Sequence, residues 1–244
     1  MKNIILAENL KMKRTMGKRM IILAPVITVL LSFLAYPFFY QCAFNWWYTL
    51  FWASIQAIVC AQVDAKEKKG LGYKNVYVLP YRPGKIWRGK LLLLAVYLFV
   101  ANLILSVLSL VFAFVFKVNV ETGIASVFLA AIVIFFTNSY QIPIYFYVVH
   151  KWNAVLAFLL SVLMSVAGVA FATKSYWWAI PFTWCTRLMV RVLHILPNGL
   201  IAEAGEKIMP SSACILPILA ISVILFAVSM YVTEKLLEQK GKME

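Results

Sequence analysis

Residues Gly84-Lys-Ile-Trp-Arg-Gly89-Lys90-Leu91 nearly match the Gly-x-x-x-x-Gly-Lys-Ser/Thr pattern that binds nucleotide phosphates. In that pattern the last residue supplies a hydroxyl group for Mg²⁺, and a buried strand precedes the glycine-rich turn. Leu91 has no hydroxyl group, no strand-like segment leads into the motif, and the residues that follow are apolar enough to cross a membrane. We therefore expect no nucleotide site and no ATP hydrolysis in this chain.

Metal binding and nucleophilic catalysis are also poorly supported. The cysteines and histidines of the chain are Cys42, Cys60, Cys185, Cys214, His150 and His194. They form no Cys-x-x-Cys or His-Glu-x-x-His pattern, and no serine, aspartate or cysteine has a spacing that indicates a catalytic triad. The sequence thus predicts a protein that is not an enzyme and has no metal or cofactor of its own. Spacing alone does not establish a disulfide between Cys185 and Cys214.

Uncharged polar side chains inside apolar segments are the remaining candidates for function. They include Gln56, Asn102, Asn138, Ser139 and Gln141. Such groups usually form hydrogen bonds between helices, but they could also line the path of a substrate, and the sequence leaves both interpretations open. Pro143 frees a backbone carbonyl near three of them, which makes residues 138–143 the first stretch to inspect.

Six apolar segments carry these residues, each close to the roughly 20 residues that cross a bilayer. They are residues 20–40, 45–63, 91–116, 122–149, 152–173 and 213–233, and none contains Asp, Glu, Lys or Arg. The whole chain is 64% hydrophobic and 13% charged, far from the composition of a soluble domain. Because unpaired backbone groups cannot face lipid, we expect an all-α integral membrane protein with six transmembrane helices in a single domain, residues 1–244.

The formal net charge of +14 is explained by topology. Residues 1–19, 64–90, 150–151 and the tail from residue 234 hold 18 of the 23 Lys and Arg, against 5 in the connections on the other side. An excess of Lys and Arg marks cytoplasmic segments, so both termini are expected in the cytoplasm. This distribution argues against nucleic acid as a partner.

Two cytoplasmic segments have unusual composition. Residues 1–19 mix apolar and basic side chains, which predicts a helix lying on the inner membrane surface; the alternative is a solvated basic tail. Residues 64–90 are rich in Tyr, Val, Leu and Trp for a loop in water, which indicates a surface for a protein partner. The alternative is a loop folded onto its own membrane surface.

Residues 174–212 form the long outer connection. Within it Thr183, Arg187, Arg191 and His194 recur at spacings of four, four and three among apolar residues that include Trp184. This pattern predicts an amphipathic helix in the outer leaflet, between the fifth and sixth spans. A structural cap over the bundle and a lid that meets a hydrophobic substrate are both consistent with it.

The chain resembles the permease subunits of ABC-2-type transporters, most closely those of lantibiotic-immunity transporters of Gram-positive bacteria. The resemblance rests on the basic amphipathic start Glu8-Asn9-Leu10-Lys11-Met12-Lys13-Arg14, on six spans, and on a first cytoplasmic loop of the form Glu67…Gly70…Leu79-Pro80…Ile86-Trp87…Gly89-Lys90. It covers essentially the whole chain, but its motifs are diffuse.

The resemblance implies a multi-pass subunit in the cytoplasmic membrane of a Gram-positive bacterium. A cytosolic ATPase, in two copies and carrying ATP and Mg²⁺, would dock on the 64–90 coupling loop. The contact residues would be Lys74, Asn75, Val76, Tyr77, Leu79, Pro80, Arg82, Ile86 and Trp87. A second, different permease chain would complete the complex, which would expel an amphipathic peptide antibiotic from the membrane and so give immunity or resistance.

Two alternatives stay open at this stage. The chain could belong to an exporter of another drug, a lipid or a polysaccharide, or it could be a membrane scaffold or sensor partner that transports nothing. Neither the substrate, the partner permease nor the direction of transport follows from the sequence.

Overall fold

The computed structural model describes residues 1–69, 81–118, 122–203 and 205–240. Its longer helices are α1 (Lys2–Lys11), α2 (Met16–Ser32), α3 (Phe39–Trp46), α4 (Trp52–Lys68), α6 (Pro83–Val115), α7 (Ile124–Ser139), α8 (Gln141–Lys151), α9 (Ala154–Ala172), α10 (Trp184–Val192) and α11 (Ile215–Lys240). Within these described ranges no strand forms, apart from an isolated bridge between Ile195 and Ile201. The expected all-α architecture is therefore confirmed.

Four helical stretches are long and apolar enough to cross a membrane. They are Met16–Ala35, Pro83–Val115, Ala154–Ala172 and Ser212–Gln239. The pair α7 and α8, which bends by 44°, makes a fifth if both helices form one span. The chain is thus a helical membrane protein with four or five candidate spans by this measure, against the six that the sequence predicts.

The second predicted span, residues 45–63, lies in an unbroken helical run from Phe39 to Lys68. This run consists of α3, a π-helical turn (Trp47–Phe51) and α4. It packs against α2, α8 and α9, and both Trp47 and Trp52 are completely buried. Because other helices surround it, the run tolerates polar residues that a lipid-facing helix would not, which explains its lower apolarity.

The bend between α7 and α8 occurs at Tyr140, inside the predicted fourth span. Pro143 has no N–H group, so the carbonyl of Ser139 has no helical partner four residues later. In the same turn the Ser139 hydroxyl donates a separate hydrogen bond to the carbonyl of Phe136 at 2.9 Å. The stretch 138–143 is therefore the irregular part of this span, as its proline indicates.

Several predicted boundaries are wrong in detail. Residues 1–19 do not form one helix, because α1 ends at Lys11 and Thr15 caps the start of α2 by accepting a hydrogen bond from the backbone N–H of Lys18. Residues 64–90 include parts of two helices: α4 extends to Lys68 and α6 begins at Pro83, a residue favoured in the first helical turn. Residues 69–82 separate these two helices, and 70–80 among them lie outside the described residues.

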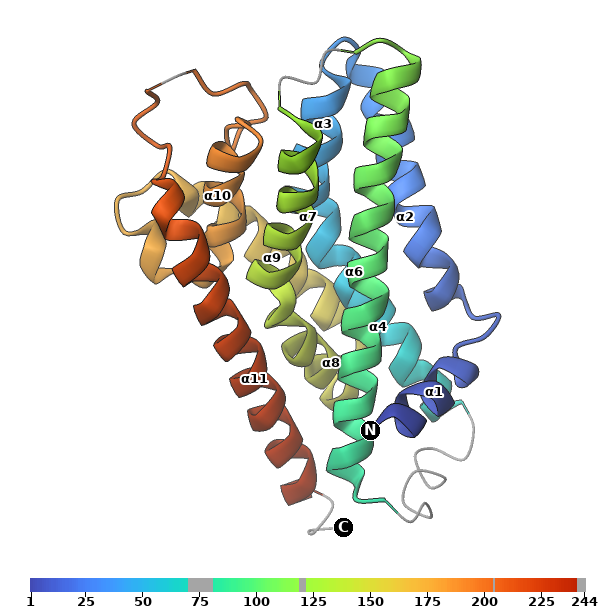
Figure 1. Ribbon diagram of the computed structural model, residues 1–244. Helices are drawn as coiled ribbons and strands as arrows, with labels where there is room; N and C mark the ends of the chain where they lie inside the picture. Colours follow the sequence, from blue (N-terminus) through green and yellow to red (C-terminus); the bar gives the residue numbers. More distant parts are fainter. Residues whose placement is uncertain (70–80, 119–121, 204, 241–244) are drawn as a thin grey trace.

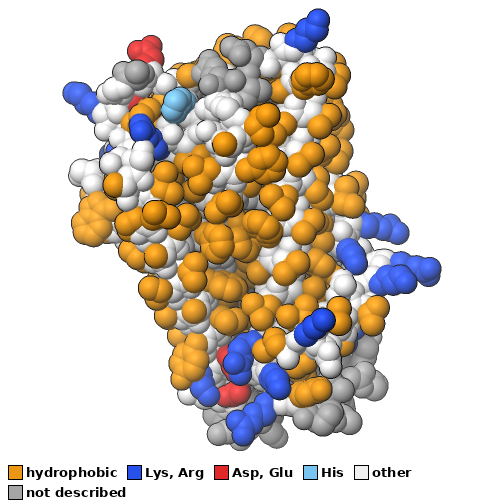
Figure 2. All heavy atoms as spheres, in the orientation of Figure 1, with side chains coloured by type: hydrophobic (Ala, Val, Ile, Leu, Met, Phe, Trp, Pro, Cys, Tyr) orange, Lys and Arg blue, Asp and Glu red, His pale blue; other side chains and the backbone are white. Residues whose placement is uncertain are grey.

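The helices form an elongated bundle in which α1 and the C-terminal end of α11 lie at the same end (Figure 1). We call this the basic end, defined by residues 1–19, 64–69, 81–90, 150–151 and 234–240. Of the four long spans α6 is the most buried, and α9 and α11 are the least. Their outward residues contribute to a broad apolar belt, with Lys and Arg gathered mainly below it and beside it (Figure 2).

Candidate functional site

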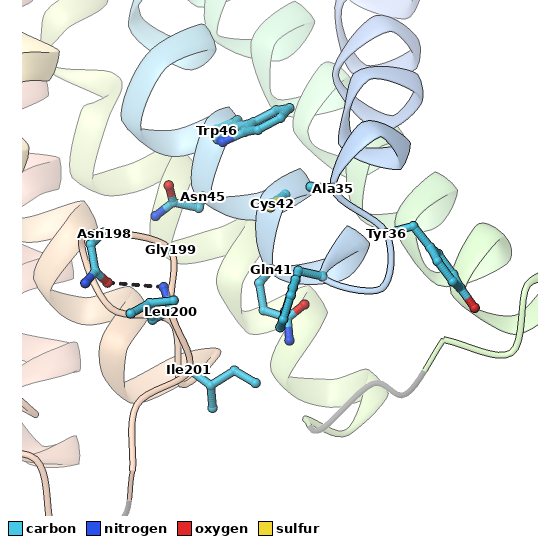
Figure 3. Close-up of a pocket in the computed structure, with 11 residues that line it drawn as sticks. Ala35, Tyr36, Gln41, Cys42, Asn45, Trp46, Asn198, Gly199, Leu200 and Ile201 are labelled. Carbon is cyan, nitrogen blue, oxygen red and sulfur yellow. Dashed lines mark hydrogen bonds between the residues drawn. The ribbon is translucent and has the colours of Figure 1, made fainter.

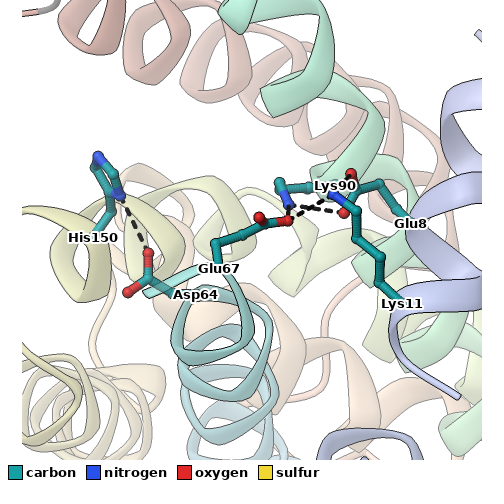
Figure 4. A network of polar contacts seen from close by, with 6 residues as sticks. All are labelled: Glu8, Lys11, Asp64, Glu67, Lys90 and His150. Atoms are coloured by element: carbon teal, nitrogen blue, oxygen red, sulfur yellow. Dashed lines mark hydrogen bonds and ion pairs between the residues drawn. The ribbon is translucent and has the colours of Figure 1, made fainter. Parts of the chain in front are cut away.

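Four charged side chains meet at the basic end, from three separate elements. Glu8 and Lys11 come from α1, Glu67 from α4 and Lys90 from α6 (Figure 4). Lys90 Nζ lies 2.7 Å from Glu8 Oε2 and also contacts Glu67 Oε1. Lys11 Nζ lies 2.8 Å from Glu8 Oε1 and 2.8 Å from Glu67 Oε1. Each lysine thus contacts both glutamates, and two positive charges balance two negative ones.

Burial makes this four-residue network more consequential than a surface ion pair. The side chain of Lys90 is only 3% exposed and that of Glu8 only 6%. Charges withdrawn from water to this extent are tolerated only when they are paired, whereas exposed pairs contribute about 0–1 kcal/mol. The network therefore fixes α1 against α4 and α6.

The titration of its members follows from these contacts. Burial by itself lowers the pKa of Lys11, but hydrogen bonds to Glu67 and Glu8 outweigh this and leave the pKa above its ordinary value of 10.5. Burial by itself raises the pKa of the Glu67 carboxyl, but hydrogen bonds from Lys11 and Lys90 outweigh this and hold the pKa below 4.5. Both groups are therefore charged at neutral pH.

Apolar and neutral contacts reinforce the attachment of α1. A Cβ atom on Gly89 would lie 2.5 Å from Cγ2 of Ile4, so only glycine lets α1 approach α6 this closely. Asn9 Oδ1 accepts hydrogen bonds from the Tyr97 hydroxyl at 2.6 Å and from Lys18 Nζ at 3.2 Å. Ile4, Glu8 and Lys11 fall on one face of α1, at spacings of four and three.

Further polar contacts tie the other helices together at the same end. Asp64 of α4 lies 3.1 Å from Nδ1 of His150 on α8 (Figure 4). Arg88 of α6 lies 3.0 Å from Glu234 of α11. Elements on both sides of the 69–82 connection are therefore linked to α1, α8 and α11.

The predicted ATPase-docking residues fall into two groups. Lys74, Asn75, Val76, Tyr77, Leu79 and Pro80 lie outside the described residues. Arg82 is exposed and occupies the N-cap position of α6 without a side-chain capping hydrogen bond. Ile86 and Trp87, however, are 2% and 3% exposed, so in this conformation they offer no free side chain to a partner.

Trp87 supports the bundle from inside. Its indole N–H donates to the Thr233 hydroxyl at 3.2 Å, and its ring lies 4.4 Å from that of Phe146, centroid to centroid. The sequence predicts that Trp87 lies at the end of a loop and contacts a partner. In the structure it belongs to α6, since that helix begins at Pro83, and the helical turn directs it towards α8 and α11.

The four predicted intramembrane amide side chains are all buried, but the structure does not gather them into one open path. Asn102 accepts a hydrogen bond from the Trp47 indole at 2.9 Å and donates to the carbonyl of Ala131. Gln141 Nε2 donates to Asn138 Oδ1 at 3.2 Å. Three of the four therefore bind helical segments together, and their use as a substrate path stays a prediction.

Gln56 differs from these residues. It is completely buried, and neither its amide oxygen nor its amide nitrogen has a hydrogen-bond partner in the described structure. Cys60, one turn further along α4, contacts the carbonyl of Ile142 on α8. Gln56 therefore lies on the face of α4 that meets α8, close to the bend.

The outer helix differs from its prediction. α10 (Trp184–Val192) is buried between α7 and α9 instead of lying on the surface. Arg187 is 8% exposed, donates to the carbonyl of Ala172 at 2.9 Å, and lies over the ring of Trp177. These contacts allow the Arg187 side chain to be buried. The spacing of polar residues in the sequence gives no information about such contacts, and it therefore predicts an exposed Arg187.

Of the polar face predicted for the outer helix, only Arg191 and His194 are exposed. Arg191 is exposed and donates to the Ser212 hydroxyl at 2.8 Å. His194 is exposed but lies beyond α10, because it adopts a left-handed backbone conformation at φ 56° that ends the helix. The four cysteines are free.

Within the described residues, no three His, Cys, Asp or Glu side chains are placed to hold a metal ion. The arrangement at the basic end suits mechanical attachment of one helix to others rather than catalysis. No family model, no curated protein and no solved structure matches this chain.

Proposed function

We propose that this chain is the membrane-spanning permease subunit of an ATP-driven exporter whose ATPase is a separate cytosolic protein. One observation carries the proposal: the buried network of Glu8, Lys11, Glu67 and Lys90 ties α1 to the two helices that flank the 69–82 connection. An ATPase that docks on this connection could then move α1, α4 and α6 as one unit.

The topology that we propose has six spans with both termini in the cytoplasm. Five of these spans are the candidates identified by length and apolarity. The sixth is the helical run Phe39–Lys68, in which residues 45–63 carry no charge. An even number of spans agrees with α1 and the end of α11 lying together. The positive charge of that end favours the cytoplasmic side.

The finer assignments rest on the resemblance to ABC-2-type permeases of lantibiotic immunity. On that basis two ATPase copies and a second permease chain complete the complex in the membrane of a Gram-positive bacterium. The substrate is an amphipathic peptide antibiotic, removed from the membrane and expelled. The absence of Asp, Glu, Lys and Arg from all six predicted segments supports an external energy source, since proton-coupled transporters usually carry ionisable groups there.

The test is purification of the tagged chain from native membranes in mild detergent, followed by mass spectrometry. We expect an ATP-binding-cassette ATPase and a second multi-span protein with the parent chain. Lys90→Met should lose the ATPase, because α1 is released from the bundle. Lys174→Met, an exposed lysine remote from the network, is the matched control and should retain it.

Other results would overturn the proposal. Recovery of neither protein with the parent chain would contradict a permease role. Recovery of a kinase or another regulatory protein instead would favour the scaffold or sensor function. Full recovery of the ATPase with Lys90→Met would show that the network does not support docking.

A further inference from the structure

The structure contains a cavity at the end of the bundle opposite the basic end. It has a volume of about 340 Å³ and lies between the start of α3 and the turn at residues 198–201 (Figure 3). Its lining includes Tyr36, Gln41, Cys42 and Trp46. This volume is at the lower end of the range for sites that hold small molecules.

The wall of the cavity is held in place by specific contacts. Asn45 Nδ2 donates to the carbonyls of Leu196 at 3.3 Å and Pro197 at 3.5 Å, which fixes the outer turn against α3. Gly199 has a φ of +87° and lies against the Asn45 side chain, where a Cβ atom would be 3.4 Å away. A larger residue would be strained there and would narrow the cavity.

Gln41 supplies an unsatisfied polar group at this site. The residue is 9% exposed and lines the cavity, and its Oε1 atom is enclosed and has no hydrogen-bond partner in the described structure. Rotation of the terminal amide interchanges Oε1 and Nε2 without moving the rest of the side chain, so the amide can turn Oε1 towards the cavity and Nε2 away from it. In that orientation Oε1 can accept a hydrogen bond from an N–H donor of a ligand, such as a neutral amide supplies.

The remaining lining restricts the chemistry of the ligand. None of the described residues around the cavity is charged, and aromatic and aliphatic side chains make up most of its surface. An ammonium or carboxylate group would lose its hydration there without gaining a counter-ion. A neutral amide on an apolar chain loses much less hydration free energy than a charged group does, and it can form a hydrogen bond with the Gln41 amide.

We infer that this cavity binds a neutral amide N–H carried next to an apolar side chain, as an uncharged stretch of peptide presents it. The binding itself does not depend on an ATPase. Its role as an outer contact for an exported peptide rests on the proposed function.

Cys42 provides a direct readout, because its half-buried thiol lines the same cavity. In a Cys214→Ser background the other two cysteines, Cys60 and Cys185, are buried. The chain is placed in lipid nanodiscs, and its reaction with methyl methanethiosulfonate is followed by intact-protein mass spectrometry. The probes are N-acetyl-leucinamide, which is neutral, N-acetyl-leucine, which is an anion, and leucinamide, which is a cation at neutral pH.

We expect N-acetyl-leucinamide to slow the modification of Cys42 in a saturable manner, and the two charged probes to slow it much less. Gln41→Leu should weaken this protection about tenfold, the equivalent of one lost hydrogen bond, when the Cys42 rate with each probe is divided by the rate of the same variant without a probe. Gln62→Leu changes a glutamine on α4 away from the cavity and should leave protection intact. Equal thermal midpoints for the two variants exclude misfolding as the cause.

Several results would overturn the inference. Equal protection by all three probes, or no protection by any, contradicts an amide-selective site. Unchanged protection in Gln41→Leu removes the assigned recognition group. If Cys42 reacts only after transfer from nanodiscs to detergent, an acyl chain of a lipid occupies the cavity. The ATPase pull-down is unaffected by each of these results, so failure of this site and failure of the permease proposal are distinguishable.

Discussion

The ammonium group of Lys90 lies 2.7 Å from the carboxylate of Glu8, and this buried contact joins residues 82 positions apart in the chain. Glu8 belongs to the short helix α1, which has few apolar residues inside the bundle, among them Ile4. A helix of 10 residues is marginal on its own, so its position depends on contacts with other elements. The network with Lys11 and Glu67 supplies those contacts.

The first prediction concerns Lys90→Met. Methionine keeps the length of the side chain but leaves Glu8 and Glu67 without the buried cation. Breaking a buried ion pair from one side typically costs about 3–5 kcal/mol. We expect a lower thermal midpoint in detergent and faster tryptic cleavage after Lys11, Lys13 and Arg14.

Lys174→Met is the control. Its free energy of unfolding should be within about 0.5 kcal/mol of that of the parent chain, because Lys174 is exposed. The triple variant Lys90→Met, Glu8→Gln, Glu67→Gln should recover much of the loss, since it removes the unpaired charges. A Lys90→Met chain as stable as the parent would contradict the importance of the network.

The second prediction concerns pH. Because the folded-state pKa of Glu67 is below 4.5, its contribution is present above the unfolded-state value and is lost as pH falls through the folded-state pKa. Because the folded-state pKa of Lys11 is above 10.5, its contribution is present below the unfolded-state value and is lost as pH rises through the folded-state pKa. We therefore expect α1 to stay attached between these limits and to detach in acid and in strong alkali.

A spin label can follow this detachment, because Leu10 of α1 is 69% exposed. In a chain with Cys42→Ser and Cys214→Ser, a label on Leu10→Cys should become more mobile at both extremes of pH. A label on Leu34→Cys, at a residue 83% exposed and remote from the network, should show no such change. Mobility at Leu10 that is independent of pH would contradict the electrostatic attachment of α1.

The sequence predicts the outline of this fold but not the network. Apolar segments locate the helical regions because lipid demands long runs without charge, and Pro143 marks the bend between α7 and α8. Glu8, Glu67 and Lys90 appear in the sequence as charged residues of two cytoplasmic segments and as parts of diffuse motifs, and neither feature indicates that the three side chains meet. Their meeting depends on how α1 packs across α6, which no local pattern specifies.

Burial that no local sequence pattern reveals is the common reason for the other errors. Spacing placed Arg187 on the outer surface of the membrane, because an arginine among apolar residues usually marks an interface. The Ala172 carbonyl and the Trp177 ring, both distant in sequence from Arg187, allow it to be enclosed. Ile86 and Trp87 were likewise assigned to a loop, because their helix begins earlier than the apolar run does.

The third prediction concerns Gly168 of α9. A Cβ atom there would lie 2.6 Å from the backbone carbonyl oxygen of Phe182, and a backbone atom cannot move aside as a side chain can. Gly168→Ala should therefore separate α9 from the segment before α10, at a cost of about 1–3 kcal/mol that thermal unfolding would detect. Gly123→Ala is a control for steric contact alone, because a Cβ atom there meets nothing within 4 Å, and it should lose only the few tenths of a kcal/mol that alanine costs at the N-cap of α7. Equal stability of the two variants would contradict this close approach.

The fourth prediction concerns the pair Trp47 and Asn102, which decides between helix attachment and a substrate path. The Asn102 side chain joins the indole N–H of Trp47 to the backbone carbonyl of Ala131, so Asn102→Ala leaves both groups unpaired in the bundle. We expect a loss of about 1–2 kcal/mol, as for interhelical hydrogen bonds in membranes. The losses from Asn102→Ala and Trp47→Phe should not add in the double variant, because both remove the same hydrogen bond. Unfolding in mixed micelles measures all three variants. Strictly additive losses, or a large fall in transport without any loss of stability, would instead place Asn102 on the path of the substrate.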